Sequence, residues 1–141
     1  MRRKTTLFAV FGFIIFFAIE AQAADWVYYA TGSADGCSFY YDPQSIKRVS
    51  EDIVQVWEKK VFTEKDAKKA INELGPEFKE LSFDKCLKEF NCNEKKSRTL
   101  SVIYYNKDGG VIESVSSASS WDFVVPDSGV EALFNIVCGG H

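Results

Sequence analysis

The sequence predicts an α+β protein in which an antiparallel meander sheet packs against a C-terminal helix, with a second, short helix in mid-chain. Runs of β-favouring apolar and aromatic residues recur along the chain and alternate with short turn-type segments. Two other segments repeat their apolar residues with helical spacing. The chain has 141 residues, of which 46% are hydrophobic, enough for one core and too few for two well-packed domains.

Residues 1–23 have the features of a secretory signal peptide: a cationic start, an apolar run from Leu7 to Ile19, and a small-x-small cleavage motif ending at Ala23. As a helix that run would reach only about 20 Å, short of the ~30 Å hydrocarbon core of a bilayer. We therefore expect cleavage before Ala24 and a single exported domain over residues 24–141, in the periplasm or at the cell surface. No cysteine follows the cleavage site, so we expect no lipid anchor.

The chain is acidic. Its formal net charge is -3, and residues 24–141, with 14 basic and 19 acidic side chains, carry -5. A chain of this charge is repelled by phosphate, which argues against nucleic acids and anionic membrane surfaces as partners. No later segment is apolar enough to span a bilayer.

An opening β-hairpin is predicted from two aromatic runs, Trp26–Ala30 and Ser38–Tyr41, which a turn-rich pentad separates. Pro43 ends the second strand because proline cannot donate to a β-ladder. We expect Asp42 and Ser45 to cap a short 3₁₀ segment there.

The strongest strand is predicted over Ile53–Phe62. Within it we expect Trp57 to point into the core, with Gln55 and Lys59 nearer the solvent.

A short amphipathic helix is predicted over Thr63–Leu74, where apolar residues recur at helical spacing opposite a lysine-rich face. Thr63 and Asp66 supply an N-terminal cap, and Gly75 and Pro76 stop the helix, the glycine in the left-handed conformation. We interpret the basic face as solvated and not as an anion site.

Residues Ser82–Asn93 fit either a helix or a strand, and we predict a strand. A further hairpin is predicted over Arg98–Asn106 and Gly110–Ser116, because an Asp-Gly turn lies between two β-rich runs. Tyr104 and Tyr105 should then face opposite sides of it.

The last helix is predicted to begin at a capping box formed by Ser128 and Glu131 and to end at Gly139-Gly140. Its apolar stripe would cover one face of the sheet.

Four cysteines in an exported chain favour two disulfides: Cys37, Cys86, Cys92 and Cys138. Their wide spacing argues against a zinc site. If Ser82–Asn93 is extended, Cys86 and Cys92 lie about 20 Å apart, too far for a bond that needs Cα atoms within roughly 7 Å. Two pairings remain open on this geometry.

The order of several short motifs carries a family resemblance. These motifs are Trp26, Tyr40-Tyr41-Asp42-Pro43-x-Ser45-Ile46, Val54-x-Val56-Trp57-x-Lys59, Phe90-Asn91-Cys92-Asn93-Glu94-Lys95-Lys96 followed by Arg98 and Leu100, Trp121-x-x-Val124-Val125-Pro126-x-Ser128-x-x-Glu131-x-Leu133, and Cys138. The sequence resembles the bacterial surface-adhesin protein E family over essentially the whole of residues 24–141.

The resemblance implies a sheet of about six antiparallel strands packed by the C-terminal helix, in exported proteins whose named member is an adhesin for host extracellular proteins. It favours a disulfide between Cys92 and Cys138, both part of the family pattern, which would fasten the helix to the sheet. Cys37 would then pair with Cys86. Because the pattern consists mainly of core and turn residues, it predicts the fold better than the ligand.

Aromatic doublets provide the candidate binding surface: Tyr28-Tyr29, Tyr40-Tyr41 and Tyr104-Tyr105. Adjacent strand residues point to opposite faces, so one tyrosine of each doublet should leave the helix-covered core and join an aromatic patch on the open face. We expect the three tryptophans, Trp26, Trp57 and Trp121, to be core residues.

No catalytic, metal or cofactor motif is evident, so we expect a non-enzymatic protein without a cofactor. The expected function is binding of a host matrix or envelope protein by an exported, adhesin-type module. The alternative is a small periplasmic inhibitor or envelope-assembly factor. Exposed sheet edges or the tyrosine face could also support a homodimer.

Overall fold

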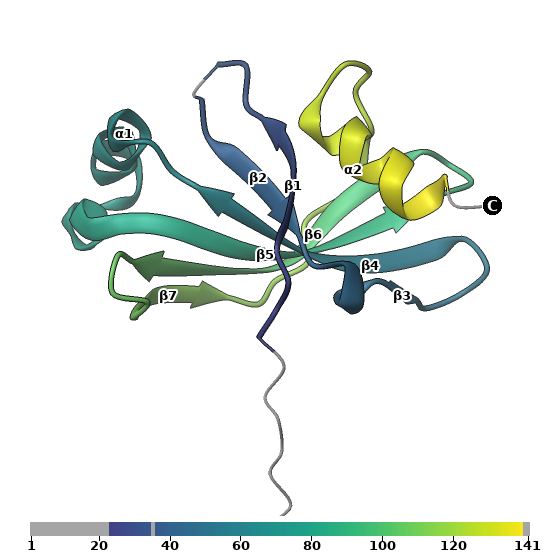
Figure 1. Cartoon of the computed structure of the whole chain (residues 1–141), viewed down its shortest axis with the longest axis horizontal. Coiled ribbons are helices and arrows are strands. Elements are labelled where there is room, and N and C mark those ends of the chain that lie inside the picture. The colour runs from purple at the N-terminus through teal and green to yellow at the C-terminus, as the bar shows by residue number, and fades with distance from the viewer. Residues whose placement is uncertain (1–22, 35, 140–141) are drawn as a thin grey trace, which may run out of the picture.

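A computed structural model describes residues 23–34 and 36–139. Six principal strands form one antiparallel meander in the order β1-β2-β4-β5-β6-β7, as predicted (Figure 1). Their bounds are Val27–Thr31 (β1), Ser38–Tyr41 (β2), Ile53–Val61 (β4), Leu81–Asn91 (β5), Lys96–Asn106 (β6) and Val111–Val115 (β7). The two-residue strands β3 (Lys47–Arg48) and β8 (Asp122–Phe123) pair with β4 and β6.

The predicted signal peptide lies outside the described residues, except for Ala23. Within the described part of the chain, no helix is both long enough and apolar enough to cross a membrane.

The ambiguous segment Ser82–Asn93 is a strand, because nearly all of it belongs to β5, at the centre of the sheet. Its neighbours β4 and β6 are both antiparallel to it. A bulge near Leu81 turns that residue to the same face as Asp84, so the alternation of side chains is reset once at the start of the strand.

Helix α1 (Glu64–Leu74) begins where the sequence predicts, with the Thr63 hydroxyl accepting from the amide of Asp66. Gly75 has φ 126° and ψ 165°, a positive φ but not the left-handed helical conformation expected of it. This extended geometry leads the chain straight into a 3₁₀ helix, η2 (Pro76–Glu80). Another 3₁₀ helix, η1 (Pro43–Ser45), follows β2 and is capped by Asp42 as predicted.

Helix α2 (Gly129–Cys138) starts at the predicted cap, where Ser128 accepts from the amide of Glu131. The Glu131 carboxylate reaches back one residue further than a capping box requires and accepts from the amide of Asp127 at 2.7 Å. Gly139 ends the helix.

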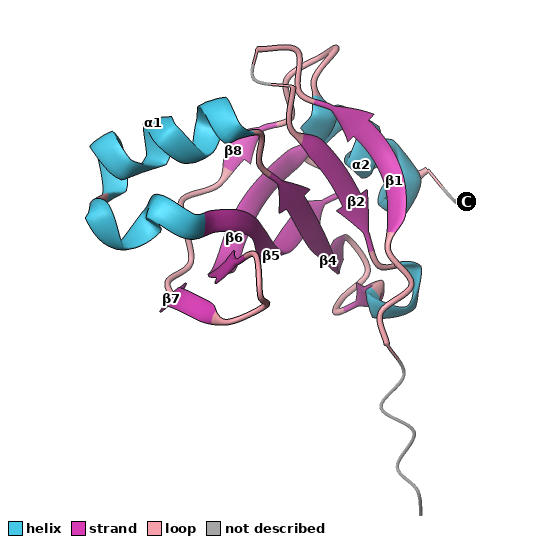
Figure 2. Cartoon of the chain, turned by 60° about the vertical axis from the view of Figure 1, so that its left-hand side comes forward, coloured by secondary structure: helices cyan, strands magenta, loops and turns pink. Residues whose placement is uncertain are grey.

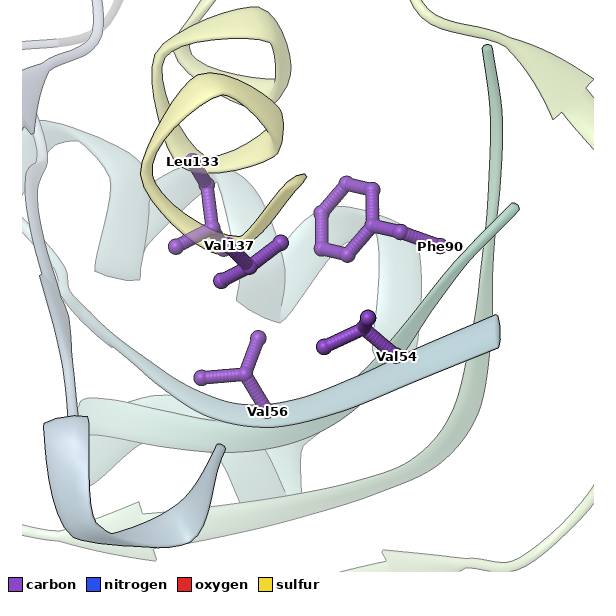
Figure 3. Close-up of a cluster of buried hydrophobic side chains, with 5 residues drawn as sticks. All are labelled: Val54, Val56, Phe90, Leu133 and Val137. Atoms are coloured by element: carbon purple, nitrogen blue, oxygen red, sulfur yellow. The ribbon is translucent and has the colours of Figure 1, made fainter. Parts of the chain in front are cut away.

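Both helices lie on the same face of the sheet, α2 at one end and α1 at the other (Figures 1 and 2). Between α2 and the sheet, five side chains form a buried cluster: Val54, Val56, Phe90, Leu133 and Val137 (Figure 3). A smaller cluster, where α1 and η2 meet the sheet, consists of Ala70, Phe78 and Leu81. The other face is covered by neither α-helix, and we call it the helix-free face.

Trp57 is not part of the core under α2, contrary to the prediction. Val54 and Val56 are 1% and 0% exposed, and they fill the space under the helix. Residues of one parity share a face of a strand, so Gln55, Trp57 and Lys59 all lie on the helix-free face.

A disulfide joins Cys92, just after β5, to Cys138, the last residue of α2, with a Cα–Cα distance of 5.5 Å. It attaches the helix to the sheet, as the resemblance implies. The other predicted bond is wrong: Cys37 and Cys86 are buried and are not joined by a disulfide. Strand β4 lies between β2 and β5, and two strand spacings of ~4.8 Å exceed the Cα separation that a disulfide allows.

Candidate functional site

A row of side chains crosses the helix-free face at one level of the sheet. Cross-strand register places Tyr28 opposite Tyr40, Tyr40 opposite Lys59, Lys59 opposite Lys85, and Lys85 opposite Ile103. The row runs over five neighbouring strands, from β1 to β6. Its members come from distant parts of the chain, and only the meander brings them together.

The tyrosine doublets divide between the two faces as alternation predicts. Tyr29 and Tyr41 pack against the cluster under α2, and Tyr104 packs on Phe78 near η2. Their neighbours Tyr28, Tyr40 and Tyr105 belong to the helix-free face. Only these three remain candidates for a surface that the helices leave open.

The three tyrosines of the helix-free face take part in two separate ring contacts. The rings of Tyr28 and Tyr40 meet edge to face with centroids 5.7 Å apart, and Tyr28 is 54% exposed. Tyr105 stacks on Phe83 at 4.7 Å. The lysines of the row lie between these two aromatic pairs.

A pocket of about 250 Å³ opens beside the row. It is lined by aromatic, aliphatic and charged side chains: Ala24, Trp26, Asp42, Trp57, Lys85, Ile103 and Tyr105. Trp26 and Trp57, predicted as core residues, are therefore half-buried walls of a surface pocket. Amphipathic aromatic rings of this kind supply much of the binding energy in protein interfaces.

The two lysines lie over aromatic rings. The Lys59 ammonium is 4.6 Å from the centroid of Phe83 and 6.0 Å from that of Trp26. The Lys85 ammonium is 5.6 Å from Trp26 and 5.0 Å from Tyr105. Partial burial, and then the neighbouring charge of Lys85, lower the pKa of Lys59.

A polar network lies at the end of the helix-free face near β8. Glu89, 5% exposed, accepts from Nε of Arg98 at 2.8 Å and from Nε2 of Gln55 at 2.6 Å. Trp121 covers this network, since its ring centroid lies 4.5 Å from the Arg98 guanidinium. Trp121 is thus half-buried and has a structural role at this end.

Buried ionisable groups collect on the opposite face, between the two helices. Burial, and then the nearby Glu58 carboxylate, raise the pKa of Asp84 to about 6. Burial and Asp84 raise the pKa of the Cys86 thiol, which favours the protonated and unreactive form. Cys37 donates to the Asp66 carboxylate at 2.9 Å. In residues 23–34 and 36–139, no group of three or more potential ligands could hold a metal ion.

Comparison with known proteins places the chain in a family. The family model for surface-adhesin protein E matches residues 26–139. The chain belongs to the surface-adhesin protein E family. This match spans every strand and both α-helices, and it includes the residues of the row and all of those lining the pocket except Ala24.

Solved structures of the adhesin E fold agree with this assignment. The selenomethionine form of Haemophilus influenzae protein E matches with a TM-score of 0.52 and 16% identity, over 80% of this chain and 87% of that one. Crystal form II of the same protein matches with a TM-score of 0.50 and 16% identity, over 79% and 87%. At this identity the likeness establishes the shared fold alone. No curated protein matches the sequence significantly.

Sequence reasoning missed Lys59 and Lys85 as members of the face, and it assigned Trp26 and Trp57 to the core. Alternation within the predicted strand Ile53–Phe62 could have placed Lys59 beside Trp57. The opposition of Lys59 to Lys85 depends on strand register, for which the sequence carries no local signal.

Proposed function

We propose that this chain is an exported, non-catalytic binding module of the adhesin type, and that its helix-free face contacts a protein partner. The observation that supports the proposal best is the continuous row of aromatic and lysine side chains on this face, next to a pocket walled by Trp26 and Trp57. Membership in a family named for surface adhesins supports the same function.

The composition of the face agrees with a protein ligand. Large rings with polar tips give contact area at little cost in side-chain entropy, and they are enriched in interface hot spots. The thiols and carboxylates between the helices are already hydrogen-bonded within the chain, so they favour a structural role.

The first experiment determines where the protein meets its partner. We call residues 24–141, the product of the predicted cleavage, the mature chain. Protease treatment of intact cells should remove the mature chain if it is displayed at the surface. A chain that stays protected until the outer envelope is opened would be confined to the periplasm, where it could not act as an adhesin.

The second experiment identifies the class of partner. The mature chain, checked as a monomer or dimer by sedimentation, is used to capture host matrix proteins and, separately, proteins of the cell's own envelope. We expect capture of a matrix protein. Capture from the envelope extract alone would support the alternative of a periplasmic inhibitor or assembly factor.

A variant of the face links capture to the proposed surface. Tyr28→Ser with Tyr40→Ser removes the exposed edge-to-face pair, and we expect it to lose binding. The matched control is Leu74→Ser with Ile136→Ser, which removes two exposed apolar side chains from α1 and α2. This control should bind as the wild type does.

A further inference from the structure

Lys59 and Lys85 form an unusual pair, because two like charges occupy directly opposed positions on neighbouring strands. Like charges placed opposite each other destabilise a sheet. In the described part of the chain, the ion pairs are made by other lysines and by arginine, and none of them joins Lys59 or Lys85 to a carboxylate. The pair therefore costs stability, with only the faces of the surrounding rings as compensation.

The surroundings of the two ammonium groups define what could neutralise them. Both lie within 6.0 Å of the centroid of one ring, that of Trp26, and the two residues are paired directly across neighbouring strands. A single small anion placed between them would therefore neutralise both. The adjoining pocket has apolar walls formed by Trp57 and Ile103. Asp42 also lines this pocket, but its carboxylate is engaged as a helix cap, since it accepts from the amide of Gln44 at 3.0 Å.

The charge of the rest of the molecule narrows the class of anion. The chain as a whole carries a net charge of -3, so a densely charged polyanion gains no long-range attraction to it. A single carboxylate next to apolar groups meets two positive charges and an apolar pocket. An acidic protein segment has this combination, whereas a sulfated glycan presents a high charge density and few apolar groups.

We propose that Lys59 and Lys85 together bind a carboxylate of an acidic protein segment that lies across the helix-free face, with an apolar neighbour of that carboxylate in the pocket between Trp26 and Trp57. This rests on the proposed function, since it specifies the chemistry of the partner that the face would contact. Burial of the carboxylate would relieve the repulsion between the two lysines.

The test uses a capped peptide of alternating valine and glutamate residues, labelled for fluorescence anisotropy. A glutamine-for-glutamate peptide serves as its neutral match, and heparin as the sulfated glycan. Tryptophan emission reports on binding near Trp26 and Trp57. We expect the glutamate peptide to bind the mature chain about tenfold more tightly than the glutamine peptide, the effect of two partly exposed charge contacts.

The decisive variant is Lys59→Gln with Lys85→Gln, and its matched control is Lys65→Gln with Lys68→Gln, which removes two exposed lysines from α1. We expect the first to bind the glutamate peptide about tenfold more weakly and the control to bind normally. Because the first variant removes a repulsion, its urea midpoint should equal or exceed that of the wild type, which shows that lost binding is not lost folding.

Several results would overturn the carboxylate site: equal binding of both peptides, binding of heparin without binding of the glutamate peptide, or wild-type affinity in the Lys59→Gln, Lys85→Gln variant. The proposed function has a separate readout. If that variant still captures the matrix protein while the Tyr28→Ser, Tyr40→Ser variant does not, the carboxylate site is refuted and the binding face stands.

Discussion

The hydroxyl of Tyr29 donates a hydrogen bond of 2.6 Å to Oε2 of Glu58, a carboxylate that is only 5% exposed. The other carboxylate oxygen lies 4.0 Å from the Lys88 ammonium. Strands β1 and β4 are not neighbours in the sheet, so this bond links the outer hairpin to the centre across the face under the helices.

Replacement of Tyr29 by phenylalanine should lower the free energy of unfolding by about 2 kcal/mol, because a buried carboxylate loses its donor. Urea unfolding measures this. Tyr41→Phe is the matched control: its ring packs against that of Tyr29, but its hydroxyl makes no hydrogen bond to the described residues, and we expect less than ~0.5 kcal/mol. Equal losses in the two variants would show that the hydrogen bond contributes nothing.

The Cys92–Cys138 disulfide should be a major source of stability. It closes a loop with a sequence separation of 46, for which chain entropy predicts about 4 kcal/mol. We expect Cys92→Ala with Cys138→Ala to lower the urea midpoint strongly, and peptide mapping of the oxidised wild type to give this one bond, with Cys37 and Cys86 alkylated only after unfolding. A peptide that joins Cys37 to Cys86 would contradict this account.

Asp84 should make stability depend on pH. Its folded pKa of about 6 exceeds the unfolded value of ~3.9, so the folded state binds the proton more tightly. The contribution of Asp84 to the free energy of unfolding is therefore largest below the unfolded pKa and is lost as pH rises through the folded one.

The neutral variant Asp84→Asn should gain stability relative to wild type between about pH 4 and pH 7, by up to roughly 3 kcal/mol. Urea unfolding of both proteins across this range measures the difference. Asp108→Asn, in an exposed turn, is the matched control for removal of one carboxylate. A difference between Asp84→Asn and wild type that stays constant with pH would refute the buried-acid argument.

Arg98 should stabilise the end of the helix-free face near β8. Its guanidinium contacts the same oxygen of the buried Glu89 through Nε at 2.8 Å and through Nη2 at 2.6 Å. Arg98→Ala leaves that carboxylate without its cation and should cost about 2 kcal/mol, a figure reduced from that of a fully buried pair because Arg98 is partly exposed.

Lys96→Ala provides the comparison, since its partner Glu94 is 53% exposed. It should cost less than ~0.5 kcal/mol in urea unfolding. Arg98→Lys should recover only part of the loss, because an ammonium group cannot reproduce the two guanidinium contacts. Similar losses for Arg98→Ala and Lys96→Ala would argue against a structural role for the Glu89 network.

Local patterns were sufficient for the two α-helices and for most of the principal strands, whereas Ser82–Asn93 fitted a helix as well as a strand. The Thr63 and Ser128 caps lie where the sequence predicts them, because a cap depends on residues within one turn of each other. The strands and their turns are likewise short-range features, and consecutive strands joined by short connections left the meander as the simplest topology.

The faces and the cross-strand partners were harder to predict. Both alternating sets of β4 contain apolar residues, so alternation did not decide which set faces α2, and Trp57 was wrongly assigned to the core. The predicted Cys37–Cys86 bond does not form, because strand β4 lies between β2 and β5. The opposition of Lys59 and Lys85 is a property of register, which hydrogen bonding between whole strands determines.

Hydroxyl-radical footprinting tests the proposed binding face most directly. The mature chain is footprinted with and without a captured partner. We expect a bound partner to protect Trp26, Tyr28, Tyr40 and Trp57, while the exposed helix residues Leu74 and Ile136 react as in the free chain. Protection of Leu74 and Ile136, with unchanged reactivity of those four aromatic rings, would contradict a partner bound to the helix-free face.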